Sequence, residues 1–417
     1  MATPSSILKT HAINLEPYET LYKHFHANPE LSLQESSTAQ KIATHLSTLS
    51  SYEIHTGIGG HGVVGVLKNG PGKTILLRAD IDALPVKELT NLPYSSKKTM
   101  VSSSTGLETP VMHACGHDMH ITCLLAAAET LAKTQEHWSG TLIILFQPDE
   151  ERGGGAQAMV DDGLYSKVPK PDYCFGQHVM RLRAGSIGLR PGVLMAAADS
   201  MKITVFGRGG HGSLPHQTVD PVLLAAHIVV RLQGIVSREI DPSDLGVLTV
   251  GSLAAGQTEN IIADRAEIGI DFRTVKVETR EKIVEAVKRI VEAECLASGS
   301  PRRPVFVPTR RFPATVNDVD VTGRLGEAFG GYFEDFDGDT PRTNVSEDFS
   351  ILGTSLGVPC GFWFLGGIDQ GLWDRVHLEG SGEEIAGNHS ALFAPVIQPT
   401  MRAGVDALCL AALTFLQ

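Results

Sequence analysis

The sequence predicts an α/β protein in which a parallel-rich sheet flanked by helices is interrupted by a ferredoxin-like α+β domain. Short aliphatic strands alternate with helical stretches in the first and last parts of the chain, which is the pattern of a buried parallel sheet. Between these parts the order becomes strand, helix, strand, strand, helix, strand. That order is typical of the split βαβ unit of ferredoxin-like domains.

The first part begins with helices and continues with strands. The pattern is helical from Glu16 to about Ser50, except that Asn28-Pro29 requires a turn, and a second helix begins at Glu35. Runs of β-branched or aliphatic residues follow, separated by helical stretches such as Ile121–Thr134. The expected strands are Gly62–Leu67, Thr74–Ala79, Thr141–Phe146 and Tyr173–Gly176.

Carboxylates and a histidine come directly after three of these strands. Asp80 and Asp82 follow the second strand, Glu150 and Glu151 follow the third, and His178 follows the fourth. Open α/β sheets bind their ligands beyond the carboxyl ends of the strands. We therefore expect these side chains to converge on one site.

The inserted domain is expected at residues 194–309, between a first part at residues 1–193 and a last part at residues 310–417 that rejoins the first. The flanks Leu189–Gly192 and Pro308–Arg311 contain the Pro and Gly that are typical of domain boundaries. Its expected elements are Met201–Phe206, Asp220–Arg238, Gly246–Leu253, Ala266–Thr274, Glu278–Ala297 and Pro304–Pro308. The last part ends in an apolar helix, Gly404–Phe415, and the polar stretch Ser95–Thr109 is expected to be a mobile loop.

Composition excludes several classes of partner. The 417 residues include 47 acidic and 35 basic side chains, so the formal net charge of −12 repels nucleic acids and anionic membranes. The six cysteines are scattered and contain no Cys-x-x-Cys pair, and no run of eighteen apolar residues occurs. Since the start of the chain also lacks a signal-peptide pattern, we expect a soluble, cytoplasmic protein.

The densest group of potential metal ligands is the segment Met112–His120. Within it, Cys115 and His117 precede a helix whose dipole stabilises a thiolate, and imidazole and thiolate both suit transition metals. A His-rich surface loop is the alternative. A second group, the adjacent acids Asp149, Glu150 and Glu151, follows a buried strand, where cations neutralise such crowding. A solvated acidic helix start is the alternative there.

Single histidines complete the candidate ligand set. His178 and His389 are each more typical of structural residues when considered alone. Together with Cys115, His117 and Glu151 they make a set suited to two neighbouring metal ions with an open, water-bridged position.

The inserted domain contributes polar residues of its own. A turn of Gly, Ser and Pro carries His211 and His216, and Asn260 and Arg273 belong to the hairpin of the same domain. An arginine suits bidentate recognition of a carboxylate. Arg273 also fits the exposed face of a strand, and the sequence does not decide between these interpretations.

These motifs resemble those of the dinuclear metal amidohydrolases and carboxypeptidases related to carboxypeptidase G and aminoacylase. The nearest branch contains hippurate hydrolase, N-acetyl-diaminopimelate deacetylase and plant auxin-conjugate hydrolases. The resemblance covers nearly the whole chain. It rests on His26–Leu31 with Glu35, Leu77–Pro85, His113–His120, Phe146–Gly155, His211–His216 with Asp220-Pro221, Asn260–Ala263 and Ser346–Phe349.

The resemblance implies a catalytic domain interrupted by a dimerisation, or lid, domain, in a homodimer that hydrolyses N-acyl amino acids or peptide-like conjugates with a free carboxylate. It implies two divalent ions per subunit, of Zn, Mn, Ni or Co, and Glu150 as general base. It further implies that His211 reaches the partner subunit's site, and that Asn260 and Arg273 hold the substrate carboxylate. The implied metal ligands are Cys115, His117, Glu151, His178 and His389.

Three departures from the family pattern concern the substrate pocket and remove none of these ligands. Asp149 and Arg152 flank the paired Glu where small residues are usual, and Ala391 follows Ser390 where the family commonly has proline.

The sequence also allows functions other than hydrolysis. The protein could bind acyl-amino acids without catalysis, or the same site could form amide bonds in biosynthesis. A further alternative makes Cys115 a nucleophile with His117 or His120 as its base.

Overall fold

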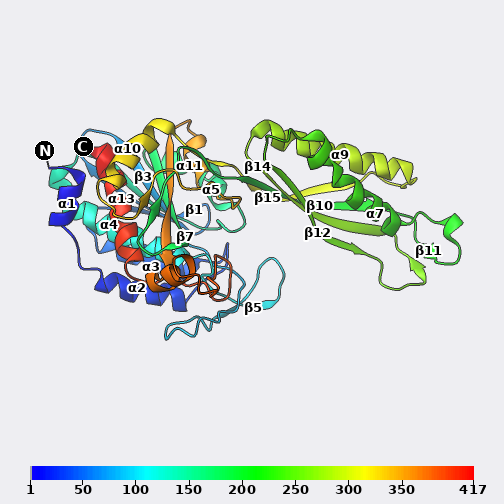
Figure 1. The fold of residues 1–417 in the computed structure, drawn as a ribbon, viewed down its shortest axis with the longest axis horizontal. Helices are drawn as coiled ribbons and strands as arrows, with labels where there is room; N and C mark the ends of the chain where they lie inside the picture. Colours follow the sequence, from blue (N-terminus) through cyan, green and yellow to red (C-terminus); the bar gives the residue numbers. More distant parts are fainter. Residues whose placement is uncertain (1) are drawn as a thin grey trace. The chain divides into compact units, whose positions relative to one another are not determined.

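The structure is a computed structural model that describes residues 2–417, and these form two compact units (Figure 1). The first unit comprises the residues up to Leu194, Val316–Arg342 and Asp348–Gln417. The second comprises Met195–Thr315 and Thr343–Glu347. The short segment Thr343–Glu347 therefore packs with the second unit, although it lies in the last part of the sequence.

An eight-stranded sheet forms the centre of the first unit, in the order β1-β2-β6-β3-β7-β18-β8-β17. The central strands β6, β3, β7 and β18 are parallel, and antiparallel pairs lie towards both edges. The predicted α/β class is confirmed. The strands are β1 (Glu53–Ile58), β2 (Gly62–Asn69), β3 (Thr74–Asp80), β6 (Gly140–Gln147), β7 (Tyr173–Arg183), β8 (Ile187–Gly188), β17 (Phe336–Asp337) and β18 (Cys360–Ile368).

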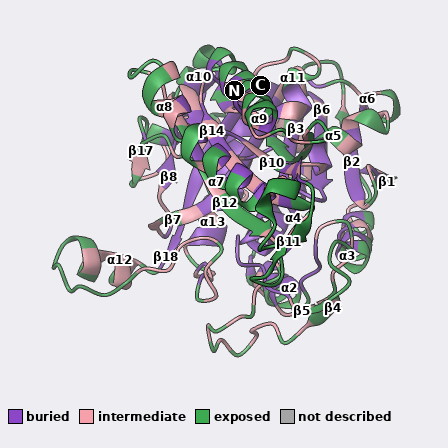
Figure 2. Ribbon diagram, turned by 90° about the vertical axis from the view of Figure 1, so that its right-hand side faces the viewer, coloured by how far each residue is buried: buried purple, intermediate pink, exposed green. Residues whose placement is uncertain are grey.

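Helices cover both faces of this sheet. The helices α4 (His117–Lys133) and α13 (Thr400–Leu416) pack against each other and against β3 and β7, and both are buried almost throughout because they are apolar on most sides. Strands of the sheet are buried too, as the purple colour of β2 and β18 shows (Figure 2). Around them lie α1 (Pro4–Thr10), α2 (Glu16–Ala27), α3 (Ser36–Ser47) and α10 (Val319–Gly330). Outside the main hydrophobic core, α5 (Gly155–Asp161) contacts β6, and α11 (Ser350–Thr354) contacts β18. The short helix α6 (Leu164–Lys167) lies beside α5, and the remaining helix of this unit is α12 (Gln370–His377).

The second unit has a four-stranded antiparallel sheet with helices on one face. The strand order β12-β14-β10-β15 and the element order βαββαβ give a ferredoxin-like arrangement. Burial alternates along β14 because one face packs against the helices. The strands are β10 (Ala197–Phe206), β12 (Gly246–Ala255), β14 (Arg265–Thr274) and β15 (Val305–Phe312); the helices are α7 (Pro221–Leu232), α8 (Gly234–Glu239) and α9 (Val277–Ala297).

The single helix expected at Asp220–Arg238 is divided into α7 and α8 at Gln233. By length and composition, Pro221–Glu239 is the one helical stretch among residues 2–417 that could cross a membrane, and 33% of its most apolar window is buried. Short pairs complete the topology: β11 (Gly210–His211) with β13 (Ile261–Ile262), and β9 (Gly192–Met195) with β16 (Thr315–Asn317).

Two expectations about the first unit were wrong in detail. The strand expected to end at Gly176 continues to Arg183, because β18 pairs with it along its length, so His178 lies within β7 and not after it. The polar stretch Ser95–Thr109 contains a hairpin of β4 (Thr99–Val101) and β5 (Glu108–Pro110). The Gln34 side chain bonds to backbone groups of Val101 and Ser103 and thereby ties this hairpin to the N-terminal segment.

Candidate metal centre and catalytic site

The predicted side chains meet where the parallel strands end. Asp80, the last residue of β3, pairs with Gln147, the last residue of β6. Arg78 pairs with Gly176 of β7, so two residues further along Asp80 and His178 lie at the same level of the sheet. The loops after β3 and β6 and the middle of β7 therefore supply one edge of the sheet with polar groups, as expected for an α/β fold.

The loop before α4 brings Cys115 to this edge, and His117 is the first residue of α4. Gly116 between them has φ +83°, and a Cβ atom there would lie 2.4 Å from Val179 Cγ1, so only glycine fits. The buried His117 ring donates from Nδ1 to the Asp82 carbonyl oxygen at 2.9 Å. Its Nε2 is buried and has no hydrogen-bond partner among the described residues.

His178 is oriented in the same way from the neighbouring strand. Its Nδ1 donates to the Val179 carbonyl oxygen at 2.8 Å, and its Nε2 lies 3.5 Å from Cys115 Sγ. Because a carbonyl only accepts, the neutral form of each ring has its lone pair on Nε2, which faces the site. Metal-binding histidines usually donate their other N–H to a carbonyl or carboxylate in this manner.

Glu151 lies between the remaining candidates. Its Oε1 is 3.8 Å from His117 Nε2, and its Oε2 is 3.4 Å from His389 Nε2. Ligand atoms of Cys115, Glu151 and His389 lie within 4.8 Å of one another, as do those of His117, Glu150 and Glu151. Glu151 thus belongs to two adjacent groups of potential ligands.

The loop of His389 is tethered to the loop of Cys115. The His389 N–H donates to the Ala114 carbonyl oxygen at 2.8 Å, and the Asn388 amide donates to the carbonyl oxygens of Cys115 and Val179 at 3.3 and 3.0 Å. The tether joins segments that are more than 270 residues apart. The role of Asn388 was not predicted, because nothing in the sequence separates it from other loop amides.

The donor atoms fit a divalent transition-metal centre. The buried His117 Nε2 and Glu151 Oε1 have no hydrogen-bond partner within residues 2–417, which is costly unless a cation binds them. Thiolate sulfur, imidazole nitrogen and carboxylate oxygen together suit Zn, Co, Ni or Mn. On these two grounds the five predicted residues can hold metal.

Without a cation, burial and the neighbouring charges favour the protonated forms of three of these ligands. Burial raises the pKa of the Cys115 thiol well above its usual range, and the carboxylates of Glu151 and Glu150 raise it further. Burial, helped by Asp82, also raises the pKa of Glu151 to about 7. Burial opposes the charged form of His117, but Asp80 and Asp82 raise its pKa to about 10. A bound cation favours the opposite forms, namely thiolate, carboxylate and neutral imidazole.

A second layer of polar groups orients this set. His120 donates from Nδ1 to Asp80 at 2.5 Å and accepts the Val179 N–H at Nε2 at 2.8 Å, so both of its nitrogens are occupied. The buried Arg78 donates to Asp80 at 2.6 Å and to Asp348 at 3.3 Å. The sequence predicted Asp80 at the site and His120 only as a possible base for Cys115, and it predicted no orienting role for these residues.

The predicted residues of the second unit lie around the β11–β13 pair and on β14. His211 is exposed, and its Nδ1 accepts the N–H and the O–H of Ser213 at 3.1 and 2.8 Å, so the neutral ring carries its proton on Nε2. The Asn260 side chain accepts a hydrogen bond from Thr258 at 2.8 Å. Arg273 donates from Nε to Asp271 and from Nη1 to Ser346, each at 2.8 Å, so its Nη2 takes part in neither bond.

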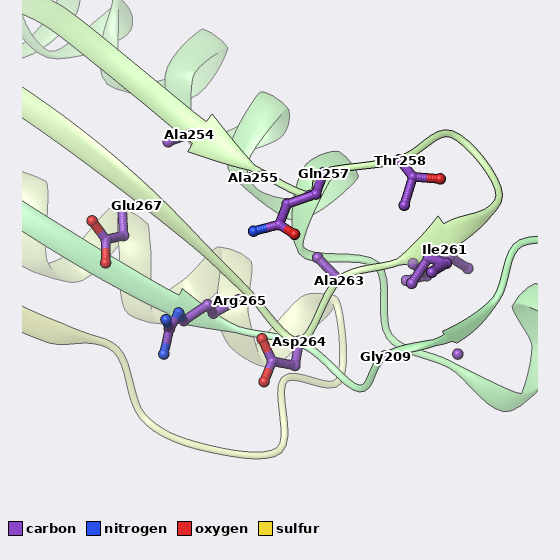
Figure 3. A pocket seen from close by; sticks show the side chains of 13 residues that line it. Gly209, Ala254, Ala255, Gln257, Thr258, Ile261, Ala263, Asp264, Arg265 and Glu267 are labelled. Carbon is purple, nitrogen blue, oxygen red and sulfur yellow. The ribbon is translucent and has the colours of Figure 1, made fainter.

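A cavity of about 640 Å³ lies beside this pair of strands in the second unit (Figure 3). Its walls include Gln257, Asp264, Arg265 and Glu267. None of the candidate metal ligands lines it. The cavity is therefore separate from the metal centre.

A family model matches residues 76–380, under the description peptidase family M20/M25/M40. The chain belongs to this family. This M20 chain is 45% identical over 282 residues to a hippurate hydrolase of Campylobacter jejuni, which covers 66% of this chain and 70% of that protein. It is 36% identical over 359 residues to an IAA-amino acid hydrolase of Arabidopsis thaliana, which covers 82% and 76%.

Two solved structures resemble it over nearly the whole chain. A putative aminohydrolase from methicillin-resistant Staphylococcus aureus has a TM-score of 0.84 at 29% identity and covers 99% of both chains. A dinuclear metal binding peptidase of the family from Bacillus subtilis has a TM-score of 0.73 at 28% identity and covers 96% of this chain and 98% of that one. The family expected from the sequence is confirmed.

Proposed function

We propose that the protein is a metal-dependent amidohydrolase that cleaves the amide bond of an N-acyl amino acid or a peptide-like conjugate with a free carboxylate. The observation that carries the proposal is the convergence of Cys115, His117, Glu151, His178 and His389 beside the buried carboxyl group of Glu150. The names of the M20 relatives, hippurate hydrolase and IAA-amino acid hydrolase, support this substrate class.

The five side chains would hold two divalent ions. Glu151 belongs both to the group with Cys115 and His389 and to the group with His117 and Glu150. When bound, such ions make water more acidic and polarise an amide carbonyl. Glu150 lies next to Glu151 and within the same group as His117, so it can accept a proton from the attacking water. It then passes that proton to the leaving amine nitrogen as the C–N bond breaks.

We assign the residues of the second unit to the substrate. The neutral His211 ring presents a donor at Nε2, which suits a carbonyl oxygen that gains negative charge, and Asn260 and Arg273 would hold the free carboxylate. We propose that His211 acts in the partner subunit's site of a homodimer. Exposed apolar residues on α7 support such an interface: Val222, Leu223 and Val230.

The test combines metal analysis with a panel of N-acyl amino acids varied at both ends. We expect release of free amine that stops on chelation and returns with divalent metal. Binding of the panel without amine release at any metal loading would favour an acyl-amino-acid binding protein, and net amide formation from acid and amine would favour a synthetic role. We also propose a cytoplasmic location, which the six free, buried cysteines support.

A further inference from the structure

The residue before the proposed general base has an unusual backbone conformation. Asp149 has φ +52°, in the left-handed region, which costs an L-residue about 1 kcal/mol. Asp149 begins a turn that is closed by its own backbone: the Asp149 carbonyl oxygen accepts the Gly155 N–H at 3.1 Å, and the Glu150 carbonyl oxygen accepts the Gly153 N–H at 2.7 Å. The N–H groups of Asp149 and Glu151, by contrast, find their acceptors in other parts of the chain.

Two buried carboxyl groups supply those acceptors. The Asp149 N–H donates to Glu35 Oε1 at 2.9 Å, and the Glu151 N–H donates to Asp82 Oδ2 at 3.0 Å. Glu35 and Asp82 are 0% and 1% exposed. The backbone is thus held immediately before and immediately after Glu150 by side chains from the N-terminal part of the chain.

Glu35 fixes a second strained residue with the same oxygen. Its Oε1 also accepts the N–H of Leu33 at 3.0 Å, and Leu33 has φ +65°. The other oxygen, Oε2, is buried and has no hydrogen-bond partner among residues 2–417. Burial and the charge of Asp82 raise the pKa of Glu35 to about 8, so at neutral pH the group is largely a neutral acid.

We propose that Glu35 is a positioning residue, which holds the Asp149 peptide and thereby directs the Glu150 carboxylate towards Glu151 and His117. The proposal rests on the proposed function, in which Glu150 is the general base. Glu35 acts through backbone bonds and not on the substrate. A glutamine in its place keeps the oxygen that accepts both N–H groups and puts an amide NH₂ where the unpartnered Oε2 lies.

Glu30 provides a matched control in the same segment. It is 4% exposed, and its Oε2 accepts the N–H and the O–H of Thr38 in α3 at 2.8 and 2.9 Å. Glu30→Ala therefore removes two bonds of similar geometry near the start of the same helix. Neither of these bonds reaches the turn of Asp149–Glu151, whose bond from Asp149 goes to Glu35.

The experiment compares Glu35→Ala, Glu35→Gln and Glu30→Ala in the metal-loaded, full-length protein. For Glu35→Ala we expect kcat to fall about 10- to 100-fold while KM changes less than about threefold and metal content is unchanged, since a small displacement of a catalytic group costs that much. For Glu35→Gln and Glu30→Ala we expect kcat within about threefold of the unmodified protein. Crystal structures of all three should show a displaced Asp149–Glu151 turn only in Glu35→Ala.

Equal kcat values for Glu35→Ala and Glu30→Ala, with the turn in place in both, would overturn the proposal. So would loss of activity in Glu35→Gln equal to that in Glu35→Ala. The crystal structures separate this inference from the proposed function. If the unmodified protein hydrolyses no N-acyl amino acid but the turn still moves in Glu35→Ala alone, the proposed function fails while the structural role of Glu35 stands.

Discussion

Replacing His26 by phenylalanine should destabilise the protein strongly without touching a proposed metal ligand. His26 is buried in α2, with Nδ1 2.7 Å from Asp118 and Nε2 3.0 Å from Glu88. Phenylalanine keeps a ring beside Tyr22 and Tyr94 but leaves the two carboxylates without their cation. His24→Phe, at an exposed position of the same helix, is the control.

The magnitude follows from the charges around the ring. Burial opposes protonation, but Asp118 and Glu88 raise the pKa of His26 from 6.5 to about 10. Such a rise corresponds to about 5 kcal/mol in favour of the protonated ring, and removing one partner of a buried ion pair typically costs about 3–5 kcal/mol. We therefore expect His26→Phe to lower the free energy of unfolding at pH 7 by about 3–5 kcal/mol, and His24→Phe by less than about 0.5 kcal/mol.

The same interaction has a defined pH dependence. Because the folded-state pKa is raised, the stabilisation is complete below about pH 6.5 and is lost as the pH rises through 10. Between these pH values, loss of the His26 proton should lower the free energy of unfolding by up to about 1.4 kcal/mol per pH unit. The His26→Phe variant should not show this decrease. Urea unfolding of metal-loaded protein between pH 7 and 10 measures both quantities. A loss below about 1 kcal/mol at pH 7, or equal pH slopes in both proteins, would refute the reasoning.

Further predictions concern the metal centre and the substrate. Glu150→Gln should lower kcat about 10²- to 10⁴-fold with unchanged metal content, measured by amine release and metal analysis; full activity would exclude Glu150 as the base. Cys115→Ser should weaken metal binding at least about tenfold and retain partial turnover at saturating metal, whereas abolished turnover at full loading would indicate thiol attack. Metal affinity should fall as the pH is lowered, because protons compete for His117 and Glu151, whose pKa values in the metal-free site are about 10 and about 7, and calorimetry in several buffers should detect proton release on binding. Ser213→Ala removes one of two donors to His211 Nδ1 and should lower kcat about 2- to 10-fold, while an unchanged kcat would show that the backbone N–H suffices.

Much of the candidate site could be predicted because its residues belong to short motifs at strand ends and helix starts. Cys115 precedes α4, His117 begins it, and Glu150 and Glu151 follow β6, so local sequence was enough to nominate them. His389 could be nominated only in combination with these, since its loop meets that of Cys115 through a backbone bond to Ala114. No local pattern predicts a contact between segments so far apart in the chain.

The sequence by itself determined the α/β class, the ferredoxin-like order of the second unit and the chemical types of the metal ligands, because hydrophobic periodicity and motif composition are local properties. Only the tertiary structure decided the length of β7, since pairing with β18 extends that strand past His178. It alone decided the tautomers of His117 and His178, which depend on carbonyl groups brought near by folding. The bond from Asp149 to Glu35 is likewise decided by folding, since it joins residues 114 positions apart.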